Sequence, residues 1–384
     1  MRREVPPLSL YVHLPWCVKK CPYCDFNSHA AGSNAPRGRY LDAVLIDLRN
    51  EAATATGRPL ISIFIGGGTP SLFSPDEIAR LLDAIERCFA LVDDVEVTME
   101  ANPGTVECGK CSGYFRAGVN RLSIGAQSFD DASLATLGRI HTSGDIARVV
   151  AEAQNAGFGN INLDLMYALP GQDVGAALDD IEAAVRLDPA HISWYQLTLE
   201  PNTVFHARPP NGLPDDELCY DIENRGQALL RECGFEQYEV SAYARDGHVC
   251  VHNLNYWSFG DYVAVGAGAH GKISNQDGVR RYTKAAHPQQ YMASMERGIP
   301  DGTPRALGDR DLLFEFMINA LRLNAGFDEQ LFEARTGLSR DALRQRLQAP
   351  LQKGLIASAA DDVWRPTAMG RRFLNDLQAD FLPE

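Results

Sequence analysis

The sequence predicts an α/β protein in which six parallel strands, each followed by a helix, curl into a partial barrel, with a small helix-rich domain after it. One observation behind this prediction is a strand-then-helix alternation that runs from Leu8 to about Leu199. Another is that glycine-rich or polar loops follow directly after the predicted strands. The carboxyl ends of parallel strands form one rim of a barrel, and functional sites are built on that rim.

The predicted barrel elements alternate regularly. The strands are short and apolar or β-branched, as buried parallel strands should be, and we expect them at Ser9–Leu14, Ile61–Ile65, Val95–Met99, Arg121–Ile124, Ile161–Leu165 and His191–Leu197. The helices are expected at Arg39–Ala55, Ser74–Phe89, Val106–Ala117, Gly144–Ala156 and Val174–Leu187. The second helix begins with a capping serine and a first-position proline. Six units rather than eight favour an open barrel.

Beyond residue 200 the pattern changes. Several prolines precede an expected helix, Asp215–Cys233, an extended piece, Glu236–Ala242, and a glycine-rich turn, Val265–Gly271. We divide the chain into a core with its extension, residues 1–300, and a small domain, residues 301–384. The small domain is expected to contain helices at Asp309–Leu323, Asp328–Thr336, Ser339–Gln348 and Ala368–Leu377, with short strands around Leu355 and Trp364.

Composition narrows the class of protein. The chain has 384 residues, 45% of them hydrophobic, and a formal net charge of −14. That acidic balance argues against a nucleic-acid surface, which needs a basic stripe. There is no stretch of about 20 apolar residues, the length of a membrane span, and no signal peptide is recognised, so the cytoplasm is the expected location. Nine cysteines without a secretion signal indicate reduced thiols and metal.

Three of these cysteines, Cys17, Cys21 and Cys24, stand within eight residues on the loop that leaves the first predicted strand. Thiolates suit zinc and iron–sulfur clusters. A cubane cluster normally takes four thiolates, so three would leave one iron open to a substrate. The alternative is a Cys3His zinc site with His29 as the fourth ligand. A second C-x2-C, Cys108–Cys111, has no partner pair at metal spacing, and we expect it to be structural or incidental.

The C-x3-C-x2-C spacing resembles that of the radical S-adenosylmethionine (SAM) superfamily, in which SAM chelates the open iron of a 4Fe–4S cluster. The resemblance implies a partial (β/α)6 TIM-like barrel and a SAM site on the rim. It assigns the SAM amino group to the loop containing Gly67, Gly68 and Thr69, and the ribose hydroxyls to Glu100. The remaining residues that it places near SAM are Tyr11, Gln127, Arg139 and Asp164. Each has a plainer reading, as a tight turn, a capping acid, a surface polar residue or a core tyrosine.

Two details indicate the branch within the related coproporphyrinogen III oxidase-like family. The dehydrogenases of that family carry a fourth cysteine two positions after the third, where this chain has Phe26. The segment His-Asn-x-x-Tyr-Trp at 252–257 resembles the haem-binding motif of the haem chaperone branch. His252 would then be an axial ligand, and Tyr256 and Trp257 would pack on the porphyrin. Cys250 is an alternative ligand, and a structural role for His252 remains open.

The leading hypothesis is therefore a cytoplasmic haem chaperone that carries a 4Fe–4S cluster, SAM and haem and delivers haem to respiratory haem proteins. Its partners would be haem and these acceptors, with transient membrane association through them, no nucleic acid, and a monomeric or dimeric state. The alternative is an oxygen-independent coproporphyrinogen III dehydrogenase, an activity that the missing fourth cysteine at Phe26 disfavours. A third reading is a structural zinc protein that docks a partner. The C-terminal domain resembles that of the same family, has a winged-helix-like order, and is interpreted as a lid or partner surface.

Overall fold

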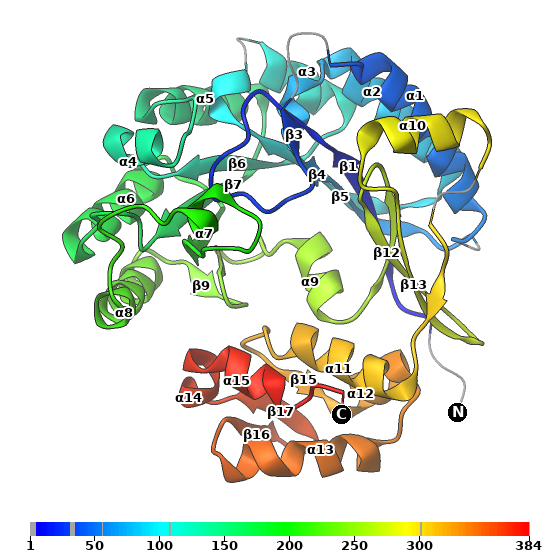
Figure 1. Ribbon diagram of the computed structural model, residues 1–384, viewed down its shortest axis with the longest axis vertical. Helices are drawn as coiled ribbons and strands as arrows, with labels where there is room; N and C mark the ends of the chain where they lie inside the picture. The colour runs from blue at the N-terminus through cyan, green and yellow to red at the C-terminus, as the bar shows by residue number, and fades with distance from the viewer. Residues whose placement is uncertain (1–4, 31–34, 56, 107–108, 300–301, 384) are drawn as a thin grey trace.

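The computed structural model describes residues 5–30, 35–55, 57–106, 109–299 and 302–383 (Figure 1). Its main feature is a twelve-stranded sheet in the order β14-β13-β12-β11-β1-β4-β5-β6-β7-β8-β10-β9. Among the described residues, the two ends of this sheet do not pair with each other, so the barrel is open. The prediction of an α/β partial barrel is thus confirmed.

Seven neighbouring strands of the sheet are parallel. They are β11 (Asp261–Val265), β1 (Leu8–Leu14), β4 (Leu60–Gly67), β5 (Leu91–Ala101), β6 (Arg121–Gln127), β7 (Asn160–Tyr167) and β8 (His191–Gln196). Six of them were predicted. The seventh, β11, runs into the glycine-rich turn that the sequence shows at Val265–Gly271, and it pairs in parallel with β1 rather than continuing the β/α series.

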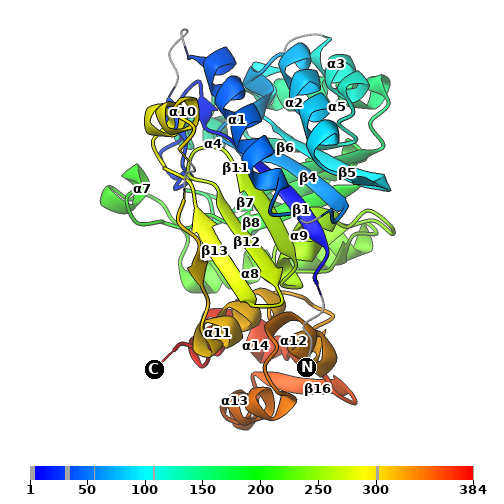
Figure 2. The same cartoon turned by 90° about the vertical axis from the view of Figure 1, so that its right-hand side faces the viewer.

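Antiparallel strands extend the sheet at both edges. On the β11 side these are β12 (His270–Asn275), β13 (Gly278–Thr283) and β14 (Arg305–Ala306); on the β8 side they are β10 (Ala242–Ala244) and β9 (Glu236–Gln237). Figure 2 shows β12 and β13 as a ribbon that reaches down toward the C-terminal part of the chain. The ribbon of β12 and β13 therefore extends from the barrel toward the C-terminal part of the chain.

Helices cover the outer face of the sheet, as crossover connections require (Figure 1). They are α1 (Arg37–Ala52), α2 (Pro75–Cys88), α3 (Lys110–Ala117), α4 (Asp131–Thr136), α5 (Ser143–Ala156), α6 (Val174–Arg186) and α8 (Asp216–Glu232). The predicted start of α2 is confirmed, because Ser74 and Glu77 form a capping box around Pro75. Short α4 was not predicted.

Parallel strands buried on both faces give the molecule its main hydrophobic core. In β1, Leu10, Val12 and Leu14 are all fully buried, as are Ile65 and Met99 on the two strands beyond. Around the rim lie short elements that shape the loops. They are β2 (Trp16–Cys17), β3 (His29–Ala30), η1 (Pro70–Leu72), η2 (Pro103–Thr105), α7 (Val204–Ala207) and α10 (Pro288–Glu296).

One helix, α9 (Val251–Trp257), lies on the inner side of the curved sheet rather than outside it (Figure 1). It packs against β4, β1 and β11 at the end of the barrel opposite the cysteine loop. Its first turn is held by Glu96, whose carboxylate accepts hydrogen bonds from the backbone N–H groups of Val251 (2.9 Å) and His252 (3.0 Å). The helix therefore closes the interior of the barrel from below.

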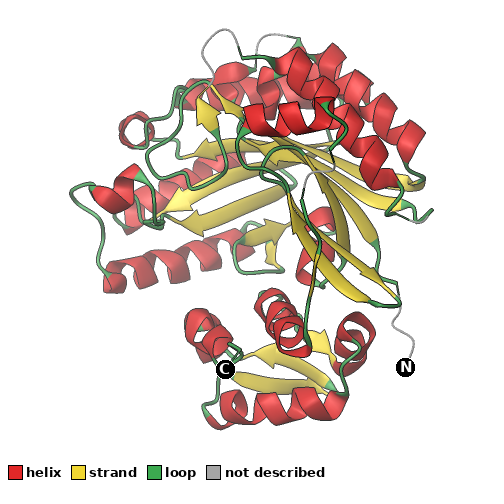
Figure 3. Cartoon of the chain, turned by 45° about the vertical axis from the view of Figure 1, so that its right-hand side comes forward, coloured by secondary structure: helices red, strands yellow, loops and turns green. Residues whose placement is uncertain are grey.

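The C-terminal part has its own three-stranded sheet and hydrophobic core (Figure 3). Its elements are α11 (Asp309–Ala320), β15 (Phe327–Asp328), α12 (Glu329–Thr336), α13 (Arg340–Gln352), β16 (Ile356–Ala360), β17 (Val363–Pro366), α14 (Ala368–Arg372) and α15 (Leu374–Ala379). The predicted last helix is interrupted at Phe373, whose backbone is not helical (φ −110°, ψ 47°). Phe259 and Val279 of the preceding region also join this core.

Among the described helices, none is long and apolar enough to cross a membrane.

Candidate functional site

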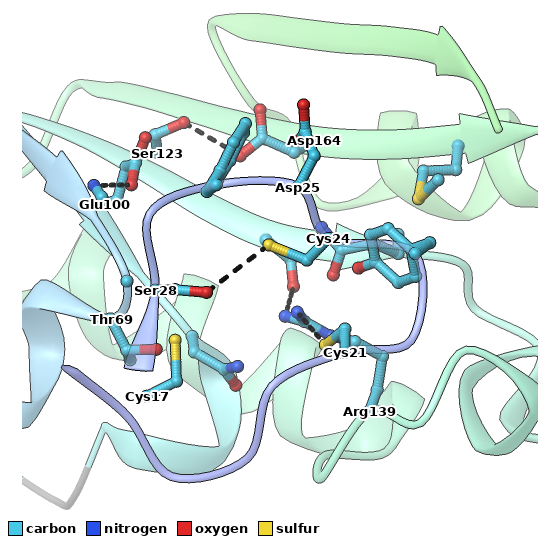
Figure 4. A pocket seen from close by; sticks show the side chains of 18 of the residues that line it. Cys17, Cys21, Cys24, Asp25, Ser28, Thr69, Glu100, Ser123, Arg139 and Asp164 are labelled. Atoms are coloured by element: carbon cyan, nitrogen blue, oxygen red, sulfur yellow. Dashed lines mark hydrogen bonds between the residues drawn. The ribbon is translucent and has the colours of Figure 1, made fainter. Parts of the chain in front are cut away.

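The unusual residues of the rim loops meet around one cavity of about 430 Å³ at the carboxyl ends of the parallel strands. Figure 4 shows Cys17, at the end of β2, and Cys21 and Cys24, in the loop between β2 and β3, facing side chains from the strand ends. Seven of the eight side chains or glycines predicted for SAM line the cavity: Gly67, Gly68, Thr69, Glu100, Gln127, Arg139 and Asp164. The predicted convergence on one rim is therefore found in the structure.

Tyr11 is the eighth, and it does not line this cavity. Its hydroxyl donates a hydrogen bond to Nδ1 of His13 (3.0 Å), and Nε2 of His13 donates to the carbonyl of Asn27 (2.9 Å). Its ring stacks beside Phe64 inside the barrel, with the centroids 6.2 Å apart. Tyr11 thus helps to hold the cysteine loop through His13.

The cysteine loop is anchored near its C-terminal end and closed by an internal turn. Asn27 donates hydrogen bonds to the carbonyls of Ala267 (2.9 Å) and Ala286 (2.8 Å), and a backbone bond from Cys24 N–H to the Cys21 carbonyl (3.2 Å) closes a turn. A fixed loop holds its thiols in place without further ordering when a ligand arrives.

The thiols have polar neighbours that suit thiolate formation (Figure 4). Arg139 Nη1 donates to Sγ of Cys21 (3.6 Å), and Sγ of Cys24 lies 3.8 Å from the hydroxyl of Ser28. Burial raises the pKa of both Cys17 and Cys24, while hydrogen bonds from Thr69 and Ser28 to Cys17, and from Ser28 to Cys24, act in the opposite direction. A positively charged metal centre would supply the remaining stabilisation of the thiolates.

The contacts of His29 disfavour the zinc alternative. A single zinc ion needs ligands that converge at about 2.0–2.3 Å from one point. His29, the expected fourth ligand, instead bonds to Oδ1 of Asn27 (3.2 Å) and packs against Trp16 and His287. Three thiols spread along the wall of a cavity suit a larger cluster.

The glycines at the end of β4 and directly after it allow the chain to pass close to the strand that carries the cysteine loop. A Cβ on Gly67, where φ is +117°, would lie 2.6 Å from the His13 ring. A Cβ on Gly68 would lie 2.6 Å from the backbone carbonyl carbon of Pro15. Only glycine fits between the strand that carries the cysteine loop and the cavity.

Two carboxylates face the cavity and disfavour each other's charge. Burial, and then repulsion by Asp164, raise the pKa of Glu100 to about 7, while the Gly67 N–H that donates to its Oε2 (3.0 Å) acts against the shift. Burial also raises the pKa of Asp164, although Asn162 (2.8 Å) and Ser123 (3.0 Å) donate hydrogen bonds to it. A cationic ligand between them would favour the ionised form of both.

Gln127 and Arg139 carry unused polar atoms at the cavity wall. Gln127 ends β6 in a left-handed conformation (φ 66°), where the pairing with β7 shifts register. Among the described residues, its buried Oε1 and the buried Nε of Arg139 have no hydrogen-bond partner. Strain and unsatisfied polar atoms at one place are features of ligand-binding sites.

The three residues predicted for haem are not brought to one surface. His252 lies inside the barrel, 8% exposed, with Nδ1 3.1 Å from the hydroxyl of Ser62 and its ring 5.0 Å from that of Phe64. Burial lowers its pKa to about 3. Tyr256 and Trp257 are at the other end of α9 and line a different cavity. Cys250 is fully buried and donates toward Glu96 (3.5 Å).

The sequence reasoning missed Ser123 and Tyr195, which also line the cavity. Ser123 is a polar residue between the apolar Leu122 and Ile124 of a predicted strand, and this interruption was the available signal. Nothing in the sequence singles out Tyr195. Cys108 lies outside the described residues. Cys111 is a buried thiol of α3 that packs in the main core and does not line the cavity.

Comparison with known proteins agrees with this geometry. The family model described as the Radical SAM superfamily matches residues 11–184, and the HemN C-terminal domain matches residues 307–373. The solved structure of coproporphyrinogen III oxidase (HemN) from Escherichia coli superposes with a TM-score of 0.83 at 24% identity, covering 98% of this chain and 90% of that one. Fold and site thus define a radical SAM protein with a HemN-type C-terminal region.

Similar sequences identify the family to which the chain belongs among radical SAM proteins. The chain is 48% identical to heme chaperone HemW of Escherichia coli over 382 residues, which cover 99% of this chain and 100% of that protein. It is 47% identical to HemW of Haemophilus influenzae, with 99% of both chains covered, and 36% identical to HemW of Bacillus subtilis, with 98% and 99% covered. The chain belongs to the HemW family.

Proposed function

We propose that this protein is a haem chaperone that holds a 4Fe–4S cluster and SAM in the rim cavity, binds haem, and delivers it to respiratory haem proteins. The observation that carries the proposal is the 48% identity, across the whole length of both chains, to a protein named heme chaperone HemW. The free thiols of the described cysteines suit the reducing cytoplasm, where we propose that the protein acts.

Cys17, Cys21 and Cys24 would hold the cluster. Their loop is fixed by Asn27, and Arg139 already lies beside the thiol of Cys21, where it offsets negative charge. When bound, such a cluster presents one open iron to SAM and can pass it an electron.

The remaining wall of the cavity would bind SAM. Glu100 uses Oε2 for the Gly67 N–H, so Oε1 remains as an acceptor for ribose hydroxyls. The two carboxylates, Glu100 and Asp164, would attract the positive sulfonium, and the unpaired Oε1 of Gln127 offers a further acceptor. These roles explain why polar groups are kept inside a largely apolar barrel at an energetic cost.

Coproporphyrinogen III dehydrogenase activity is the alternative function. The fold match to HemN is compatible with it. Phe26 stands where a fourth cysteine would be expected; its side chain is 60% exposed and borders the cavity. A phenyl ring there supplies no thiol, and for this reason we favour the chaperone.

The test is anaerobic reconstitution of the cluster followed by two assays on the same preparation. Titration with haem should show saturable, stoichiometric binding, and incubation with coproporphyrinogen III and SAM should give no product. Turnover of coproporphyrinogen III, with SAM consumed in proportion, would refute the chaperone and restore the dehydrogenase. The coproporphyrinogen III oxidase of the HemN type serves as the positive control.

A further inference from the structure

The interior of the barrel next to the rim cavity is polar. Ser123, Asn162 and His191 are register partners on the neighbouring strands β6, β7 and β8, so their side chains share one face of the sheet. Ser123 lines the cavity, whereas Asn162 and His191 do not line it and are each 1% exposed. Barrel interiors are usually filled by branched apolar side chains, and buried polar groups cost free energy unless they are hydrogen-bonded. This polar row therefore requires an explanation.

A chain of hydrogen bonds runs through this row, and it begins at a donor that cannot reverse. The backbone N–H of Cys250, the N-cap residue of α9, donates to the hydroxyl oxygen of Tyr238 (3.2 Å). The hydrogen of that hydroxyl is then directed to Nε2 of His191, 2.9 Å away. Burial, and then the charge of Arg121, hold the pKa of His191 well below its usual value, so the ring is neutral. A neutral imidazole that accepts at Nε2 carries its one hydrogen on Nδ1.

The amide of Asn162 is the next member of the chain. Its Oδ1 lies 2.6 Å from Nδ1 of His191 and also accepts a hydrogen bond from Ser193 (3.1 Å). Because the oxygen of the amide faces these two donors, its N–H groups face the other way. They donate to Oδ1 of Asp164 (2.8 Å) and to the hydroxyl of Ser123 (2.8 Å).

The chain ends on the carboxylate of Asp164, which lines the rim cavity. Ser123 passes its own hydrogen to Oδ2 of Asp164 (3.0 Å; Figure 4), so both carboxylate oxygens accept from the chain. Hydrogen bonds donated to a carboxylate favour its ionised form. Burial raises the pKa of Asp164, and the bonds from Asn162 and then Ser123 act against that shift. A chain that began at an acceptor would not have this effect, because the amide could then turn its oxygen toward Asp164.

Other titratable or charged groups also surround Asp164. They are Glu100 on β5, Arg121 on β6, Tyr195 on β8, Arg139 after α4 and Asp25 on the cysteine loop. Glu100 disfavours the ionised form of Asp164, and Arg121 favours it. All of these groups stay in place in the variants described below, so a difference between a variant and the parent protein reports on the chain.

From these contacts we propose that Asn162, His191 and Tyr238 are positioning residues for the SAM site: their hydrogen-bond chain fixes the amide of Asn162 and thereby presents Asp164 to SAM as an ionised acceptor. None of the three lines the cavity, so each acts through Asp164. The inference rests on the proposed function, because it presumes that SAM binds in the rim cavity.

The first test removes the amide. SAM is titrated anaerobically by calorimetry into the full-length, cluster-loaded protein over a pH series that extends from acidic to alkaline. Asn162→Leu should move the midpoint of the pH dependence upward by about one unit, so that SAM affinity below the midpoint falls by about tenfold. At alkaline pH the affinity should return to that of the parent protein, because Asp164 is then ionised without help from the amide.

The second test uses a matched pair at the imidazole. His191→Leu removes the donor to Asn162 and should shift the midpoint in the same direction by a smaller amount. His191→Asn places an amide N–H where Nδ1–H was and should restore most of the parent profile. Tyr238→Phe, the member farthest from Asp164, should give the smallest shift. Thr98→Val is the control, because Thr98 lies on β5 as the register partner of Arg121 and its buried hydroxyl has no hydrogen-bond partner among the described residues.

The outcomes separate this inference from the proposed function. Iron and sulfide contents, together with thermal unfolding, verify that each variant is folded, and if Asn162→Leu loses its cluster the His191 pair gives the same test. Variants that bind SAM with the pH profile of the parent protein, or that lose affinity equally at every pH, would overturn the inference and leave the SAM site standing. A cluster-loaded parent protein that binds no SAM would overturn the SAM site and the inference together.

Discussion

The substitution Glu100→Gln tests the SAM site most selectively. It preserves the size of the side chain at the end of β5 and replaces a charged acceptor with a neutral one. Gly67 N–H can still donate to the amide oxygen, so the loop after β4 should keep its position. In the part of the chain that the structure describes, the cysteine loop shares no hydrogen bond with Glu100, and the cluster should therefore survive.

The magnitude follows from the role proposed for the free carboxylate oxygen. A hydrogen bond to a charged group contributes about 1.5–3 kcal/mol, so SAM affinity should fall by roughly ten- to a hundredfold. The pH dependence should change as well. The pKa of Glu100 is raised to about 7 by burial and by Asp164, so the ligand-free site is increasingly protonated as the pH falls below that value.

If SAM binds to the ionised form, the affinity of the parent protein falls by up to about tenfold for each pH unit below the pKa. In Glu100→Gln this part of the pH dependence should disappear, and only that of Asp164 should remain.

The free energy of unfolding depends on pH with the opposite sign, because it falls as the pH rises whereas SAM affinity increases. A raised folded pKa favours the folded state at pH values below the ordinary carboxyl value of 4.5, and this advantage is lost as the pH rises through about 7. Glu100→Gln should therefore unfold less readily than the parent at pH 8.

The assay is anaerobic calorimetric titration of SAM at several pH values on either side of the Glu100 pKa of about 7. Glu182→Gln, on the exposed face of α6, is the matched control and should bind SAM as the parent does. SAM affinity that is unchanged in Glu100→Gln, with the same pH profile as the parent, would place Glu100 outside the site and refute this reasoning.

Two further predictions concern the cluster and the fold. Replacing Cys17, Cys21 or Cys24 with Ala should abolish the brown iron–sulfur absorbance, whereas the double replacement of Cys108 and Cys111 should leave it nearly unchanged; cluster loss in that double variant would show a different ligand set. Lys284→Met should destabilise the protein by about 3–5 kcal/mol in urea unfolding, because it leaves buried Asp47 unpaired beside Glu51. Adding Asp47→Asn should recover much of that loss, and an unchanged unfolding midpoint in the single variant would contradict the ion-pair account.

The barrel was predictable because its signals are local. Each parallel strand is a short apolar run, and each rim loop carries glycine or polar residues directly after it. The capping serine of α2 also acts within one turn, and the capping box confirms it. The strand β11 is also a short, mostly apolar run, but its pairing with β1 joins residues about 250 positions apart, so no local signal places it in the barrel.

The sequence predicted which residues line the site better than it predicted how their polar atoms are arranged. Family resemblance selected Glu100, Gln127 and Asp164, but only the structure reveals the unpaired Oε1 of Gln127. The haem motif shows that residues close together in the sequence can face different parts of the structure. On a seven-residue helix, His252 is turned inward to Ser62 while Trp257 faces a cavity at the other end, so residues adjacent in a motif separate in space.

Haem transfer tests the central claim most directly. The reconstituted protein is loaded with haem, freed of excess ligand, and mixed with a haem-depleted membrane fraction that contains respiratory cytochromes. The account predicts that haem leaves this protein and that the cytochrome spectrum appears, while coproporphyrinogen III is not converted under the same conditions. Retention of haem together with conversion of coproporphyrinogen III at the expense of SAM would contradict it.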